Sequence, residues 1–238
     1  MRIEGNNHFI VSNLVEDVLY ESDDQGAADV YFDTSYAGSI FGWNVWRRCG
    51  IKSNGIPKFC GRAAVRFDGH VSSQTVFCNR FEECGSDGFG AVQINGGRFN
   101  TVDNNLFVNC LIAVTIQPIA LSSWTNEILK LVSPRIFGGV DGKGIDIRKE
   151  PYTSRYPHFS RLMSSDQINL LTRNVVIGSG PFIARVPQAT ECRFNRMYGE
   201  SDVCVMPTAK ALLPVPNADE VGPCRTLRFV RAMFLDRQ

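Results

Sequence analysis

The chain has 238 residues, of which 44% are hydrophobic, and its formal net charge at neutral pH is +1. This length suits one domain or one elongated core, and the near-neutral charge lacks the imbalance that marks nucleic-acid, membrane-surface or acidic partners. No apolar run is long enough to cross a bilayer, and the first residues contain no apolar signal-peptide segment. We therefore expect neither a nucleic-acid partner nor a membrane partner.

One phrase of eleven residues recurs along the chain, with Asn at its sixth place. Its third and eighth places are apolar in every copy. The copies start at His8, Ser39, Gln74, Asn100, Asn169 and Thr190, and their sixth places are Asn13, Asn44, Asn79, Asn105, Asn174 and Asn195. The third places are Ile10, Phe41, Val76, Val102, Leu171 and Cys192, and the eighth places are Val15, Trp46, Phe81, Phe107, Val176 and Met197.

A second phrase lies between the copies and alternates apolar and polar residues, which is typical of strands. Its instances are AAVRF (63–67), GAVQI (90–94) and IAVTI (112–116), with GAADV (26–30) as a possible first instance. The alternation predicts that Val65, Phe67, Val92, Ile94, Val114 and Ile116 point inward. Arg66, Gln93 and Thr115 are then expected to point outward.

Short strands repeating every 26 to 35 residues, each followed by a turn, are typical of the coils of a solenoid. Stacked coils bury the apolar side that one coil alone leaves exposed. We expect the repeated Asn to pass amide hydrogen bonds from coil to coil and to adopt the left-handed backbone of a tight corner. The sequence therefore predicts an all-β fold, a single-stranded right-handed parallel β-helix.

The eight Cys residues include a row at the eleventh place of the repeat: Cys49, Cys84 and Cys110. Stacked coils would hold such residues within disulfide range, but free Cys also packs as a small hydrophobe, and we favour a ladder of buried thiols. No Cys-x-x-Cys pair occurs and the three His are scattered, so we expect no metal site and no cofactor.

The repeat is interrupted by an insertion of about residues 118–168, and the predicted solenoid spans 1–203. Within the insertion, 121–133 is predicted as an amphipathic helix, with Trp124, Ile128 and Leu131 on one side. Residues 149–163 are predicted as a loop rich in aromatic and basic residues. The tail, 204–238, contains no copy of the repeat and is expected to be a capping or disordered extension.

Four segments together resemble a group of right-handed β-helix proteins similar to the β-helix glycoside hydrolases that include α-L-fucosidases and xylanases, with a pectate-lyase-like fold. They are YESDDQGA (20–27), AVRFDG (64–69), AVQINGGRFNTVDNNLFVNC (91–110) and PYTSRYPHF (151–159). The resemblance covers roughly residues 5–200 and implies a secreted protein that acts on a polysaccharide or oligosaccharide.

The chain departs from this family in YFDTSYAG (31–38), where the family has an Arg-Asp-Trp-like patch, and in Gly69, where it has a second acidic residue. The first recognisable coil also lacks preceding caps, which solenoid ends need. We therefore expect a truncated or diverged copy of a longer secreted protein, acting as a monomer.

Glycoside hydrolysis needs two carboxyl groups flanking one bond. Asp24 and Asp68 lie in successive coils, and Asp68 follows an inward-pointing residue, so we predict this pair as catalytic, with Glu21 as a substitute for Asp24. Which residue is the acid and which the base or nucleophile stays open. Both also fit a plain structural reading, because ESDD (21–24) and an Asp before Gly are ordinary turn sequences.

Six further residues are predicted to bind the substrate. Asn95 and Gln117 follow Asp68 in a polar row, Arg98 could hold a sugar carboxylate, and His70 could tune Asp68. Arg155 and Tyr156 could line a cleft from the insertion. Each has a structural alternative in turn formation or surface packing.

Three functions remain open at this stage. The first is a glycoside hydrolase that cleaves a polysaccharide with paired carboxylates. The second is a polysaccharide lyase, which needs a basic proton abstractor and often Ca²⁺; the chain offers Asp23, Asp24 and Arg66 for these roles. The third is a truncated or non-catalytic glycan-binding β-helix, since fold alone does not separate these functions.

Overall fold

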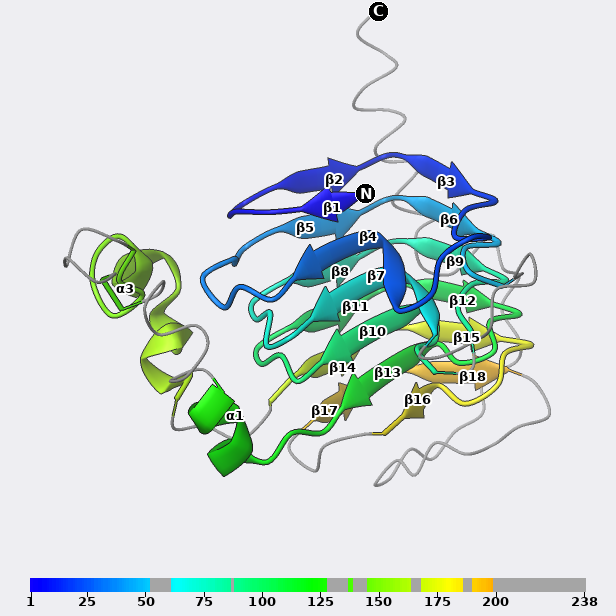
Figure 1. The fold of residues 1–238 in the computed structure, drawn as a ribbon. Coiled ribbons are helices and arrows are strands. Elements are labelled where there is room, and N and C mark those ends of the chain that lie inside the picture. Colours follow the sequence, from blue (N-terminus) through cyan, green and yellow to red (C-terminus); the bar gives the residue numbers. More distant parts are fainter. Residues whose placement is uncertain are drawn as a thin grey trace, which may run out of the picture.

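The computed structural model describes residues 1–51, 61–86, 88–127, 137–138, 145–163, 168–185 and 190–198. Three parallel sheets of six strands dominate this part of the chain, and successive strands enter the three sheets in turn (Figure 1). From β4 onward, each strand therefore pairs with the strand three places earlier in the chain. This arrangement is consistent with the predicted parallel β-helix.

Sheet A consists of β1 (Arg2–Ile3), β4 (Gln25–Tyr31), β7 (Arg62–Asp68), β10 (Val92–Asn95), β13 (Val114–Gln117) and β16 (Ile183–Ala184). Sheet B consists of β2 (Phe9–Val11), β5 (Ile40–Gly42), β8 (Thr75–Phe77), β11 (Thr101–Asp103), β14 (Leu170–Thr172) and β17 (Glu191–Arg193). Sheet C consists of β3 (Leu14–Glu16), β6 (Val45–Arg47), β9 (Arg80–Glu82), β12 (Leu106–Val108), β15 (Val175–Ile177) and β18 (Arg196–Tyr198).

The core lies between the three sheets and is built from the apolar places of the repeat. Third-place residues pair along sheet B and eighth-place residues along sheet C, in the register that the alignment predicts. In sheet C, the rings of Trp46, Phe81 and Phe107 stack with interplanar angles of 9° and 8°. The inward residues predicted for sheet A are also in this core.

The repeated Asn residues form an unbroken ladder of side-chain hydrogen bonds. Each amide Nδ2 donates to Oδ1 of the Asn in the next coil, at 2.9–3.0 Å, from Asn13 through to Asn195. The Nδ2 of Asn44, Asn79, Asn105 and Asn174 also donates to a backbone carbonyl of the preceding coil. The predicted coil-to-coil amide bonds are therefore confirmed.

The prediction that these Asn residues take the left-handed conformation is wrong. The residue before each of them has φ between 53° and 59°, namely Ser12, Trp43, Cys78, Asn104, Arg173 and Phe194, whereas none of the six ladder Asn residues has positive φ. The Asn must point its side chain along the stack, so the preceding residue makes the corner. Sequence did not identify it because its side chain varies freely from Ser to Trp.

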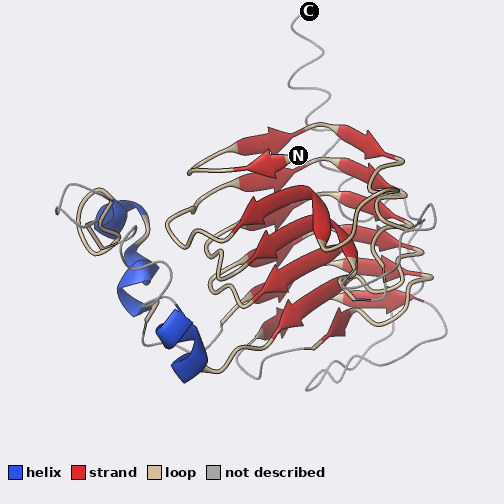
Figure 2. Cartoon of the chain, viewed as in Figure 1, coloured by secondary structure: helices blue, strands red, loops and turns tan. Residues whose placement is uncertain are grey.

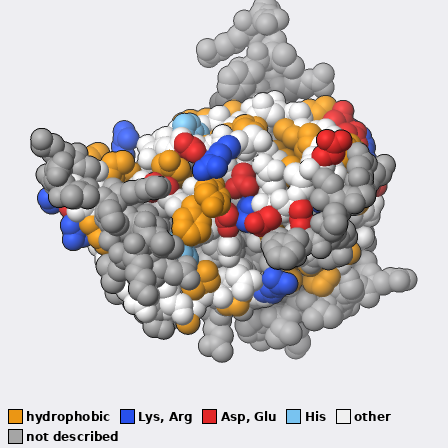
Figure 3. All heavy atoms as spheres, viewed as in Figure 1, with side chains coloured by type: hydrophobic (Ala, Val, Ile, Leu, Met, Phe, Trp, Pro, Cys, Tyr) orange, Lys and Arg blue, Asp and Glu red, His pale blue; other side chains and the backbone are white. Residues whose placement is uncertain are grey.

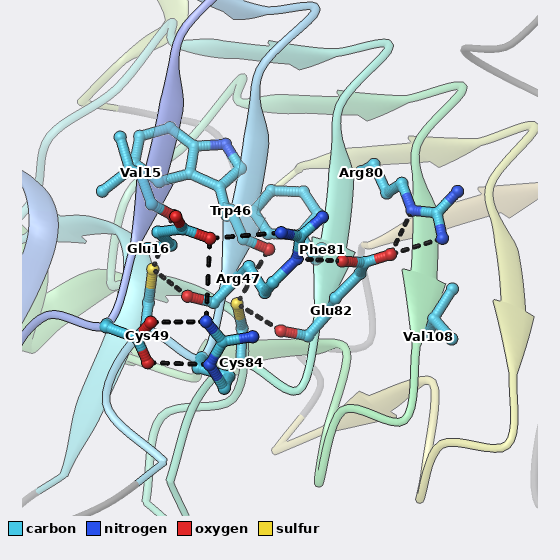
Figure 4. Close-up of polar contacts among 12 residues, drawn as sticks. Val15, Glu16, Trp46, Arg47, Cys49, Arg80, Phe81, Glu82, Cys84 and Val108 are labelled. Atoms are coloured by element: carbon cyan, nitrogen blue, oxygen red, sulfur yellow. Dashed lines mark hydrogen bonds and ion pairs between the residues drawn. The ribbon is translucent and has the colours of Figure 1, made fainter.

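The row of thiols at the eleventh place is confirmed as free and buried for Cys49, Cys84 and Cys110. Figure 4 shows that the Cys49 and Cys84 sulfurs approach backbone carbonyls, with the stacked rings of Trp46 and Phe81 nearby. On the outer side of the same strands, Arg47 bridges Glu16 and Glu82.

We predict that Cys84 and Cys110 resist alkylation in the native protein. Burial raises the pKa of both thiols well above the ordinary value, so almost no reactive thiolate forms at neutral pH. Peptide mass spectrometry after iodoacetamide treatment should find both unmodified in buffer and modified in denaturant. Labelling of Cys84 in buffer as fast as a cysteine-containing peptide would contradict this account.

The insertion begins after β13 and lies to one side of the sheets, where its helices face the turns that join sheet A to sheet B (Figure 2). Helix α1 (Leu121–Glu127) confirms the first part of the predicted helix, and Trp124 is buried; Ile128 and Leu131 lie outside the described residues. The predicted loop at 149–163 instead contains α3 (Tyr152–Arg155) and η2 (Pro157–Arg161).

These short helices form because their aromatic residues bury together in a second core. Tyr152, Tyr156 and Phe159 pack with Ala37 and Trp124, and the Tyr152 hydroxyl donates to the Ser35 carbonyl at 3.0 Å. Composition alone indicated a loop because such a short helical segment has no apolar periodicity of its own. The predicted tail at 204–238 lies outside the described residues.

Candidate functional site

The outward face of sheet A carries a buried polar cluster over β4 and β7. Pairing places Asp29 beside Arg66, Arg66 beside Gln93, and Gln93 beside Thr115. The alternation in the sequence predicts outward positions for Arg66, Gln93 and Thr115. Their side chains are nevertheless almost fully buried, since Arg66 is only 4% exposed.

Arg66 is the centre of this cluster. Its Nη2 donates to Asp24 Oδ1 at 2.8 Å and lies 2.9 Å from Asp68 Oδ2. Its Nη1 lies 3.5 Å from Asp29 Oδ2, and its Nε donates to Gln93 Oε1 at 2.9 Å. Three carboxyl groups from two neighbouring coils therefore meet at one guanidinium.

The predicted pair, Asp24 and Asp68, is thus brought together in space. Because both oxygens contact one nitrogen, they lie no more than about 6 Å apart. This limit is shorter than the roughly 6.5–9.5 Å between the carboxyl groups of inverting glycosidases and allows the roughly 5–5.5 Å of retaining ones. The two differ in environment. The Asp24 side chain is 55% exposed, whereas that of Asp68 is 9% exposed.

Two local features allow Arg66 to reach these partners. Its guanidinium lies over the Phe89 ring, 4.9 Å from the centroid. Gly26, on the neighbouring strand, leaves room for the arginine stem, because a Cβ at this position would lie 2.6 Å from Arg66 Cβ. The glycine of the Asp24-Gln25-Gly26-Ala27 segment is therefore required by close approach between β4 and β7.

Asp29 is the most unusual of the three carboxyl groups. It is 7% exposed, and its Oδ2 accepts a hydrogen bond from the Gly26 backbone N–H at 3.0 Å, while its buried Oδ1 has no hydrogen-bond partner. Burial raises the pKa of Asp29 above its ordinary value, and the nearby Asp68 raises it further, against the opposing effects of Gly26 and Arg66.

A pocket of about 190 Å³ opens beside this cluster, lined by Arg2, Asp24, Gln25, Asp29, Tyr31 and Arg66. Tyr31 is 41% exposed, and the Arg2 guanidinium lies 4.6 Å from its ring centroid. In the space-filling view, acidic and basic side chains lie next to exposed hydrophobic ones on the face formed by sheet A (Figure 3). The volume is below the roughly 300–1,000 Å³ typical of drug-sized ligands and suits one small group at a time.

The predicted polar row is present. The Asn95 amide donates to Asp68 Oδ1 at 2.7 Å, and Asn95 pairs with Gln117 in register. Arg185 donates to Gln117 Oε1 at 3.2 Å. The row therefore runs from the carboxyl cluster across three strands of sheet A.

The structure places Glu21 apart from this cluster. It lines a separate pocket of about 430 Å³ together with Asp17, Val18, Leu19, Tyr20 and Ser22. Glu21 is therefore not among the residues around Arg66, and its predicted role as a substitute for Asp24 stays a prediction.

Of the other four predicted binding residues, three lie at the junction with the insertion, namely Arg98, His70 and Tyr156. Arg98 is fully buried with its guanidinium 4.1 Å from the Trp124 ring centroid, and His70 is buried between the rings of Phe32 and Trp124.

Tyr156, which directly follows α3, is 7% exposed and donates to Asn7 Oδ1 at 2.7 Å, whereas Arg155, the last residue of α3, is exposed. Like Arg98 and His70, Tyr156 makes contacts that hold the insertion against the coils, and none of the four lines the pocket beside Arg66.

Sequence reasoning missed Asp29 as a site residue. The sequence did contain a signal for Asp29. When GAADV (26–30) is aligned with AAVRF (63–67), Asp29 takes the same outward position as Arg66, and the structure pairs these two residues. Tyr31 and Arg2 were also missed. Neither belongs to a repeated phrase, so only the fold brings them to the pocket.

Within the described ranges, no group of three or more His, Cys, Asp or Glu residues is arranged to hold a metal ion. The described helices include none long and apolar enough to span a membrane. Comparisons with protein-family models, curated proteins and solved structures give no match to this chain.

Proposed function

We propose that this protein is a carbohydrate-active hydrolase that cleaves a glycosidic bond in a polysaccharide or oligosaccharide. The observation that carries the proposal is the meeting of Asp24 and Asp68 at Arg66, beside a pocket that Asp24 lines. Hydrolysis of a glycosidic bond uses two carboxyl groups that flank the bond, and this pair supplies two carboxyl groups in one place. The resemblance to β-helix glycoside hydrolases points the same way.

The surroundings of the pair suit a sugar. Exposed Tyr31 offers an apolar ring face at the edge of the pocket, and the amides of Asn95 and Gln117 extend along the sheet as hydrogen-bonding groups. A polymer lying across the strands would meet one such group about every 4.8 Å, which is the spacing of neighbouring strands. We propose this row as the path of the bound glycan.

The same contacts disfavour the lyase alternative. A lyase needs a basic group that accepts a proton, but Arg66 donates to or contacts three carboxyl groups and has no lone pair to offer. An anionic sugar would also be repelled by the carboxyl groups around Arg66. A neutral glycan fits this charge pattern better.

We further propose that the three sheets are the faces of one right-handed parallel β-helix. Successive strands enter sheets A, B and C in turn, which supports a continuous winding. Connections between parallel strands of one sheet are right-handed in about 98% of cases, and this supports the hand. In such a helix, the outward face of sheet A presents the site along one side.

We predict that Asp68→Asn lowers glycan hydrolysis by at least about 100-fold, because carboxyl acid–base chemistry contributes roughly 10²–10⁴-fold. Purified wild type and variant are tested on a polysaccharide panel, following the release of reducing ends and the ultraviolet absorbance of unsaturated products. The matched control is Asp103→Asn. Asp103 is equally buried at 6% exposure and also pairs with an arginine, Arg173, but it lies on sheet B.

Reducing ends without unsaturated products, lost in Asp68→Asn and retained in Asp103→Asn, would support the hydrolase. Unsaturated products would assign the protein to the lyases. If neither product forms with any glycan while circular dichroism shows a folded β-rich protein, the catalytic proposal is wrong and a glycan-binding role takes its place.

A further inference from the structure

Arg66 can hold Asp24 and Asp68 together only while its guanidinium keeps one orientation. The group is planar and its N–H donors form a rigid fork, so a rotation of the group moves all of its contacts at once. Nη2 contacts both carboxyl groups, and Nη1 donates to the Asp24 carbonyl. These contacts hold the outer end of the guanidinium. The inner nitrogen, Nε, needs an acceptor elsewhere if the plane is to stay fixed.

Gln93 supplies that acceptor. Its Oε1 accepts from Arg66 Nε at 2.9 Å, and it lies on β10, on the side of β7 away from β4. Thr115 is the next outward residue along the sheet, and its buried hydroxyl has no hydrogen-bond partner among the described residues. The row of side-chain bonds therefore ends at Gln93, whose side-chain oxygen serves Arg66.

Gln93 does not face the pocket. It is 5% exposed, and the described residues that line the pocket include Asp24 and Arg66 but not Gln93. A ligand in the pocket would therefore meet Arg66 directly and Gln93 only through Arg66. Any effect of Gln93 on hydrolysis must pass through the orientation of the guanidinium.

We propose that Gln93 is a positioning residue of the site, which fixes the Arg66 guanidinium and, through it, the separation of Asp24 and Asp68. This inference rests on the proposed hydrolytic function and adds to it a residue that does not touch the substrate. Without Gln93, the Nε–H donor of Arg66 would be buried and unpaired, which favours rotation of the group toward other acceptors. A displacement of the carboxyl groups by about 1 Å is enough to slow a reaction strongly.

The first test follows the guanidinium itself and needs no substrate. In ¹⁵N NMR of arginine side chains, the Nε–H signal of Arg66 is identified by its absence in Arg66→Lys. Gln93→Met keeps the length of the side chain but lacks the amide oxygen. We expect the Arg66 Nε–H to exchange with solvent about five- to tenfold faster in this variant, as for the loss of one buried hydrogen bond. Gln93→Glu keeps an acceptor oxygen and should retain slow exchange.

The matched control for this test is Gln74→Met. Gln74 is fully buried, directly precedes β8 of sheet B, and donates from its amide to the Tyr36 and Ser72 carbonyls. Its replacement removes a similar buried amide outside sheet A. Unchanged exchange in Gln93→Met, or equal acceleration in Gln74→Met, would overturn the inference.

The second test measures turnover of the glycan that the polysaccharide panel identifies. We expect Gln93→Met to lower kcat about 10–100-fold and to change KM by less than about threefold, because misplaced carboxyl groups weaken transition-state stabilisation more than binding. Gln93→Glu should recover most of this loss, and Gln74→Met should stay near wild type.

Two kinetic outcomes separate this inference from the proposed function. A raised KM with unchanged kcat in Gln93→Met would overturn the positioning role, because Gln93 would then act in binding. Absence of hydrolysis by wild type on every glycan would overturn the proposed function itself. The two failures are therefore distinguishable.

Discussion

Replacing Asn79 with alanine is expected to lower the free energy of unfolding by about 3–5 kcal/mol, because a buried polar group left without a partner costs roughly 1–3 kcal/mol. Asn79 is fully buried in the middle of the ladder. Its Oδ1 accepts from the backbone N–H and the amide of Asn44, and its Nδ2 donates to the Phe41 carbonyl and to Asn105. Alanine would leave several of these groups unpaired at once.

The measurement is urea unfolding of wild type and Asn79→Ala, followed by circular dichroism. Asn13→Ala is the matched control, because Asn13 is exposed at the end of the same ladder and bonds to only one ladder neighbour. We expect this variant to lose less than about 1 kcal/mol, as for a single partly exposed hydrogen bond. Similar losses in both variants would mean that the ladder contributes little beyond local turn structure.

Much of the fold could be predicted because the ladder Asn marks the same place in every coil. Once Asn44, Asn79 and Asn105 are aligned, the residues three places before each Asn are predicted to pair with one another, as are those two places after it. The structure has both sets of pairs. A parallel stack repeats its environment at each coil, so one apolar place predicts the whole row. This is why the sequence predicts the core rows well.

The candidate site was less predictable because its geometry depends on one long side chain. Alternation places Arg66 on the outer face, but it does not show that the guanidinium lies down over Phe89 and reaches strand β4. Asp68, predicted to face outward, is nearly buried there, and so is Asp29. Side-chain direction across strands, and not spacing along the chain, decides which polar residues meet.

The junction with the insertion shows the same limit. Tyr156 was predicted to bind substrate because it lies in a Pro-containing aromatic segment. His70 was predicted to do so because it lies close to Asp68 in the sequence. In the structure Tyr156 bonds to Asn7, about 150 residues earlier, and His70 packs on Trp124 of α1. Contacts over such distances along the chain are fixed by how the insertion folds back on the coils, which no local pattern records.

Replacing Arg66 with methionine is expected to cost about 3–5 kcal/mol of folding free energy at neutral pH, as for other buried ion pairs that lose one partner. Methionine keeps much of the stem that packs on Phe89 but removes the cation that contacts Asp29 and Asp68, both nearly buried. The variant would therefore hold uncompensated negative charge in a shielded place. Thermal and urea unfolding at several pH values measure this cost.

The cost should shrink as the pH falls, and the sign follows from Asp29. Burial already raises its pKa in the wild type, and Arg66 opposes this, so the variant loses the opposing effect and the pKa rises further. A folded-state pKa above the unfolded value means that the folded state binds more protons, and stability is then lost as pH rises through it. As the pH falls toward the ordinary aspartate pKa of about 4, the stability of the variant should approach that of wild type.

The matched control is Arg48→Met, which removes an ion pair of the same type from the surface. Arg48 bonds to Asp17, and the two side chains are 31% and 43% exposed. An exposed pair contributes less than about 1 kcal/mol, so this variant should lose little stability at any pH. If Arg66→Met were equally mild and insensitive to pH, the carboxyl groups of sheet A would be solvated, and the contrast between Asp29 and its neighbours would not exist.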